Sequence, residues 1–67
     1  MTRAEQVSLQ RWLRRQLRQH EPLRERLEAA IENADVAEAR RIVACFEFSA
    51  AQRRHVERLI DEWEATF

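Results

Sequence analysis

Residues 9–23 read LQRWLRRQLRQHEPL, and this stretch decides the fold. Leucine recurs every four residues, at positions 9, 13 and 17, which is the spacing that gathers side chains on one face of an α-helix. Pro22 follows, and because its ring clashes with the carbonyl four residues earlier, we predict that the first helix ends or kinks near Glu21. Proline is favoured in the first turn of a helix, so a second helix is expected to begin there.

Capping residues predict the other helix boundaries. Thr2 and Glu5 have the spacing of a capping box and predict the start of the first helix. Asn33 is predicted to end the second helix in the left-handed conformation, because the chain has no glycine to take that position. Asp35, with Glu38 three residues later, predicts the start of a third helix.

The sequence leaves open whether the third helix is separate from a fourth. Ser49 and Gln52 have the spacing of another capping box, which predicts a fourth helix. Nothing between Val36 and Thr66 forbids one long helix, so three helices are the alternative. The expected fold class is all-α, a compact bundle of four short antiparallel helices, with residues 1–67 forming a single domain.

The apolar stripe of each helix predicts the core. Cys45 lies among apolar residues and is predicted to be a small buried side chain. Trp63 and Phe67 lie near the C-terminus, where they are either core anchors or a contact with another chain. The other expected core residues are Leu9, Trp12, Leu13, Leu17, Leu23, Leu27, Ala30, Ile31, Ala34, Val36, Ala39, Ile42, Val43, Phe46, Val56, Leu59 and Ile60.

The composition argues against an enzyme. Without glycine or lysine there is no glycine-rich phosphate loop and no Schiff-base lysine. No serine has an activating context, and the two histidines and Cys45 lack the spacing of metal ligands. We therefore expect no catalytic, cofactor or metal site. The single cysteine and the lack of a long apolar run predict a cytoplasmic protein without a membrane segment.

The arginines are distributed unevenly along the chain. Twelve basic residues, all arginine, balance twelve acidic residues, so the formal net charge is zero. Residues 1–21 carry five arginines against two glutamates, a net charge of +3. Arg14 and Arg15 have no acidic residue three or four positions away, so no pairing along the helix is expected for either. Together with Arg11 and Arg18 they form a basic stripe opposite the leucines.

This stripe favours a binding function. We expect a small protein-binding module (an adaptor, regulator or inhibitor, including the kind that phages and mobile elements encode) that meets an acidic protein surface. The alternative is a nucleic-acid-associated regulator that sets the same arginines on phosphates. A second copy of the chain is a further candidate partner, because so small a monomer has marginal stability. The predicted partner-binding residues are Arg11, Arg14, Arg15, Arg18, Val7, Arg53 and Arg54.

Two short segments, Leu13-Arg14-Arg15 and residues 46–51 (FEFSAA), resemble the haemolysin-expression-modulating proteins. That family consists of small helical partners of nucleoid-associated proteins, so the resemblance implies a helical partner protein. Where the family has an acidic residue after Ser-Ala-Ala, this chain has Gln52, which puts the family's partner contact in doubt. The similarity covers only these segments and needs a gap, and we assign no family from it.

Overall fold

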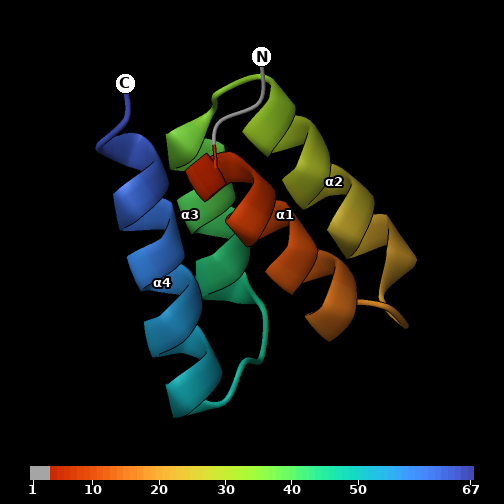
Figure 1. Cartoon of the computed structure of the whole chain (residues 1–67). Helices are drawn as coiled ribbons and strands as arrows, with labels where there is room; N and C mark the ends of the chain where they lie inside the picture. Colours follow the sequence, from red (N-terminus) through yellow and green to blue (C-terminus); the bar gives the residue numbers. More distant parts are fainter. Residues whose placement is uncertain (1–3) are drawn as a thin grey trace.

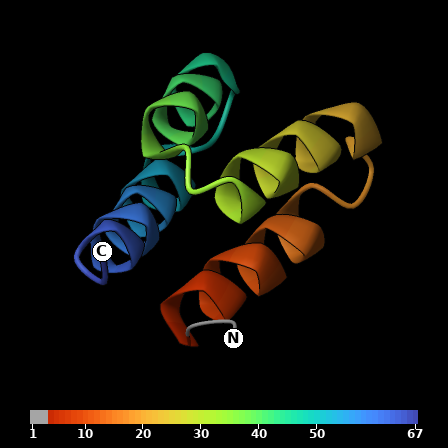
Figure 2. The same ribbon diagram turned by 90° about the horizontal axis from the view of Figure 1, so that it is seen from above.

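The computed structural model describes residues 4–67 and has an all-α fold, as predicted. Its helices are α1 (Ala4–Gln16), α2 (Glu21–Glu32), α3 (Val36–Cys45) and α4 (Ala50–Glu64). They run alternately up and down, and the three-helix alternative is wrong because α3 and α4 are separate (Figure 1). Viewed from above, the α1–α2 pair and the α3–α4 pair form two sides of the bundle (Figure 2). Each helix packs against two others: α1 and α3 each contact both α2 and α4.

The first helix ends at Gln16, before the predicted boundary near Glu21. The N–H of Leu17 still donates to a helical carbonyl, and the chain then turns before α2 begins. Leu17 is fully buried and is the last leucine of the stripe, so the chain reverses directly after it to bring α2 back across the core. Pro22 lies in the first turn of α2, as predicted. Thr2 of the predicted first capping box lies outside the described residues.

The second helix ends in a left-handed residue, but that residue is Ala34 (φ 55°) and not Asn33 (φ −88°). The N–H of Ala34 donates to the Ile31 carbonyl (3.1 Å), and that of Asp35 to the Ala30 carbonyl (2.8 Å), which together form a Schellman motif. Asp35 must also cap the next helix, so the left-handed position falls on the residue directly before it.

The N-terminal caps of α3 and α4 are confirmed. The Asp35 carboxylate accepts from the N–H of Glu38 at 3.1 Å. Ser49 Oγ accepts from the N–H of Gln52 (3.1 Å), and the Gln52 side chain accepts from the N–H of Ser49 (2.9 Å). Gln52 also donates from Nε2 to Gln16 Oε1 at 3.0 Å, which joins the start of α4 to the end of α1.

Most of the predicted core is buried or half-buried, and the exceptions are informative. Trp63 is 1% exposed and belongs to the core, whereas Phe67 is 63% exposed and rests its ring against Trp63. Ala34 and Cys45 are exposed, contrary to prediction, because Ala34 lies in a turn and Cys45 ends α3 on its outer side. Phe48 is buried although no stripe predicted it, because the α3–α4 connection folds over the core.

Replacing Ala34 by glycine should stabilise the protein. A Cβ atom in the left-handed region costs about 1 kcal/mol, and glycine removes that cost. Ala29→Gly is the matched control, because Ala29 is exposed inside α2 and the change should destabilise by about 0.5–1 kcal/mol. Urea denaturation of both variants measures the two shifts. Equal losses of stability would show that Ala34 does not hold a left-handed conformation in solution.

Candidate functional site

Arg53, one of the predicted partner-binding residues, has a structural role. It is half-buried and donates from Nη1 to the Val43 carbonyl (2.9 Å) and from Nη2 to the Phe46 carbonyl (2.8 Å). The last carbonyls of a helix lack partners within the helix, and a guanidinium fork satisfies two acceptors at once. Arg53 therefore closes the C-terminal end of α3, and these donors are not free for a partner molecule.

Arg14 is not unpaired as its sequence neighbours suggested. Its Nε donates to Glu28 on α2, a residue 14 positions away in the chain. The spacing of residues along α1 cannot predict this ion pair, because Glu28 lies on α2 and reaches Arg14 only when α2 packs antiparallel to α1. The side chain of Arg14 is 63% exposed, so the ion pair is screened by solvent and its contribution to stability is small.

Arg40 forms ion pairs with two carboxylates of α4. It donates from Nη2 to Asp61 (2.7 Å) and to Glu64 (2.8 Å), both near the C-terminal end of α4. These two hydrogen bonds raise the pKa of the Arg40 guanidinium above its ordinary value, so it stays charged throughout the accessible pH range. The remaining ion pairs are Arg24–Glu21, Arg26–Glu38, Arg41–Glu38 and Arg58–Glu62.

Within residues 4–67, four arginines have neither a carboxylate nor a hydrogen-bond partner. They are Arg11, Arg15, Arg18 and Arg54. All four are exposed, and we call them together the arginine surface. The structure thus divides the six predicted arginines into this surface and two that already have partners, Arg14 and Arg53.

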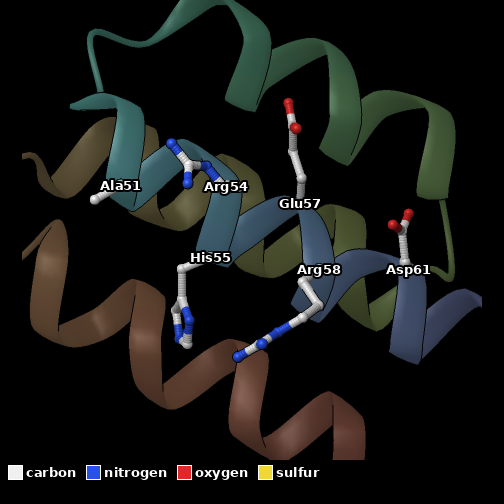
Figure 3. A pocket seen from close by; sticks show the side chains of 6 residues that line it. All are labelled: Ala51, Arg54, His55, Glu57, Arg58 and Asp61. Atoms are coloured by element: carbon white, nitrogen blue, oxygen red, sulfur yellow. The ribbon is translucent and has the colours of Figure 1, made fainter.

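The four arginines of this surface line three shallow hollows that share residues. The first hollow, about 240 Å³, lies between α1 and α4 and is lined by Ser8, Arg11, Trp12, Arg15, His55 and Leu59. The second, at the end of α1, is lined by Arg15, Gln16, Arg18, Gln19 and His20. The third follows the outer face of α4 and is lined by Ala51, Arg54, His55, Glu57, Arg58 and Asp61 (Figure 3). Arg15 joins the first hollow to the second, and His55 joins it to the third.

Figure 3 shows how the two sides of α4 differ. His55 and Arg58 extend toward α1, whereas Arg54, Glu57 and Asp61 project away from α1. Arg58 lies 4.0 Å from Glu62, at the limit of an ion pair. The side of α4 that borders α1 therefore adds basic side chains to the arginine surface.

A row of rings supports this surface from below. The half-buried ring of Trp12 lies between Phe48 (ring centroids 5.5 Å apart) and His55 (5.6 Å). Phe48 in turn contacts Phe46 (4.7 Å), which contacts His20 (5.0 Å). The row holds α1 against the α3–α4 connection and gives the hollow between α1 and α4 a packed floor.

Val7, the predicted apolar contact within the stripe, is half-buried and does not line these hollows. It lies two helical turns before Arg14, on the side of α1 that faces α2. Sequence reasoning missed Trp12 and Leu59 as site residues, because it placed both in the core. The sequence did contain a signal for Trp12 as a site residue, because it directly follows Arg11 and lies at the edge of the leucine stripe.

Neither a metal site nor a membrane span is found in the described part of the chain. No three His, Cys, Asp or Glu side chains among residues 4–67 gather where they could hold a metal ion. The described helices are too short or too polar to cross a bilayer.

Arg53→Ala should destabilise the protein by about 1–3 kcal/mol, because the partly buried carbonyls of Val43 and Phe46, at the end of α3, lose a charged donor. Arg54→Ala is the matched control: the neighbouring arginine is exposed and unpaired, so its loss should change stability by less than about 0.5 kcal/mol. Guanidinium denaturation followed by circular dichroism compares them. If the two variants unfold at the same midpoint, the Arg53 fork does not hold α3.

Scans against protein-family models, curated proteins and solved structures found no match to this chain.

Proposed function

We propose that this protein is a small non-enzymatic binding module, an adaptor, regulator or inhibitor, that recognises an acidic surface of another protein. The observation that carries the proposal is the arginine surface: four exposed guanidinium groups without partners, joined by hollows over α1 and α4. Unpaired like charges on one helix cost stability, and a bound acidic surface removes that cost. Arginine also supplies planar, forked donors that match carboxylates.

The pattern of ion pairs supports this proposal. Arginines on the same or an adjacent helix pair with Glu21 and Glu28 of α2, with Glu38 of α3, and with Asp61, Glu62 and Glu64 near the end of α4. Glu25 and Glu32 of α2 have no such partner in the described chain. The ion pairs compensate all the arginines of α2 and α3, which are Arg24, Arg26, Arg40 and Arg41. A chain with zero formal charge therefore presents a local positive surface, which steers an acidic partner to one orientation.

Nucleic acid is the second candidate, because the same four arginines could contact phosphates. The acidic side chains of Glu57 and Asp61 favour a protein instead. They line the hollow beside Arg54 and would repel a phosphate backbone that followed the outer face of α4. A protein partner can place basic residues there, but a duplex cannot.

Affinity capture with a charge-matched pair of variants tests the proposal. Arg11→Gln/Arg15→Gln removes two positive charges from the arginine surface, and Arg26→Gln/Arg41→Gln removes two from the α2–α3 side. We expect a protein captured by the wild type and the control variant, resistant to nuclease, and lost by at least tenfold from the α1 variant. Arg14 is left intact because its change would break the ion pair between α1 and α2. The control variant breaks the pairs of Arg26 and Arg41 with Glu38, but both arginines are exposed, so little stability should be lost.

Equal capture by the two variants would contradict the proposal. It would show that removing charges from the arginine surface affects binding no more than removing them from the α2–α3 side. Loss of all captured material on nuclease treatment would favour the nucleic-acid candidate. In that case the affinity for a short DNA duplex should fall with salt at a log–log slope of about −0.9 for each phosphate contacted.

A further inference from the structure

We propose that the hollow between α1 and α4 holds one apolar side chain from an acidic helical segment of the partner. We call it the Trp12 hollow; it is lined by Ser8, Arg11, Trp12, Arg15, His55 and Leu59. This inference rests on the proposed function and adds the chemistry of the partner: carboxylates around a single large apolar side chain.

The floor of the Trp12 hollow is apolar and held in place. Trp12 and Leu59 are half-buried against the core, so each leaves part of its surface uncovered. The contacts of Trp12 with Phe48 and His55 restrict the ring, and a floor that is already ordered loses little entropy when a side chain binds. Covering this surface removes apolar area from water, which is favourable.

The rim of the hollow is cationic on one side and has no anion of its own. Arg11 and Arg15 lie one helical turn apart on α1, and neither has a carboxylate partner in the described chain. Their spacing matches carboxylates on one face of a partner helix, where residues four apart are also one turn apart. Charge complementarity therefore selects an acidic occupant, with its carboxylates flanking the apolar side chain.

The size of the hollow limits what can enter. Its volume of about 240 Å³ lies below the roughly 300–1,000 Å³ of pockets that enclose a small-molecule ligand. It is large enough for one side chain inserted from a surface that continues over the arginines. An apolar anchor within a polar rim is also the common plan of protein interfaces.

The ring geometry argues against a nucleobase in this hollow. Single-stranded nucleic acid binds by stacking bases on exposed aromatic faces. Trp12 has Phe48 and His55 within 5.6 Å, inclined at 46° and 45° to its plane, so its ring already packs against two tilted rings. An aliphatic side chain needs no flat stacking surface, so these tilted rings do not exclude it.

Two synthetic helical peptides and one blocked variant test the inference. Both peptides carry glutamates four residues apart on one face; one has a leucine between them and the other an alanine. Ser8→Phe places a ring over the hollow from its exposed rim, and Ser8→Ala leaves the hollow open as the matched control. Circular dichroism confirms that both variants are folded, and isothermal calorimetry measures each affinity.

We expect the wild type and Ser8→Ala to bind the leucine peptide about tenfold more tightly than the alanine peptide. Ser8→Phe should remove this preference, and Arg11→Gln/Arg15→Gln should weaken both peptides. Equal affinity of the two peptides, or binding of neither, overturns the Trp12 hollow as an anchor site. So does a preference that survives Ser8→Phe.

The two proposals fail separately. If both peptides bind equally and both depend on Arg11 and Arg15, the arginine surface stands and the hollow does not. If neither peptide binds while capture of the partner protein still depends on those arginines, only the proposal for the Trp12 hollow is contradicted. If binding is insensitive to the arginines, the proposed function itself is wrong. Tighter binding of single-stranded oligothymidylate that Ser8→Phe abolishes would assign the hollow to a base.

Discussion

The geometry of the bundle depends on the guanidinium of Arg53. The chain has no glycine, so the reversal between α3 and α4 cannot use the residue that most readily ends a helix. Arg53, on the following helix, instead donates to the carbonyls of Val43 and Phe46 at the end of α3. The extended connection that results folds Phe48 into the core, under Trp12, and returns α4 alongside α1. The hollow between α1 and α4 exists because of that return.

The basic character of the α1–α4 side is a consequence of pairing elsewhere. Arg14 lies against Glu28, and Arg40 holds Asp61 and Glu64, so these charges are compensated within the chain. Exposed ion pairs add little to stability, but they decide which charges stay available to a partner. The zero net charge of the chain does not reveal which arginines are unpaired; only the ion pairs of the folded structure show it.

The helix boundaries show which local rules suffice. The caps at Asp35 and Ser49 were predictable because each needs only residues up to three positions away. The left-handed residue is Ala34, although the preference of asparagine for this conformation predicts Asn33. Asp35 caps the next helix directly afterwards, and this requirement outweighs the side-chain preference. Cys45 was misplaced in the core because its neighbours are apolar, although the helix turns its side chain outward.

The leucine stripe, Pro22 and the caps at Asp35 and Ser49 are local patterns, and they were enough by themselves to determine an all-α chain with a basic first helix. Only the tertiary structure decided that Arg53 is a cap, that Arg14 is paired, and that Trp12 and His55 lie together under the arginine surface. The physical reason is distance along the chain. Contacts across antiparallel helices join residues that helical periodicity cannot relate, so the side chains available for binding are set by packing.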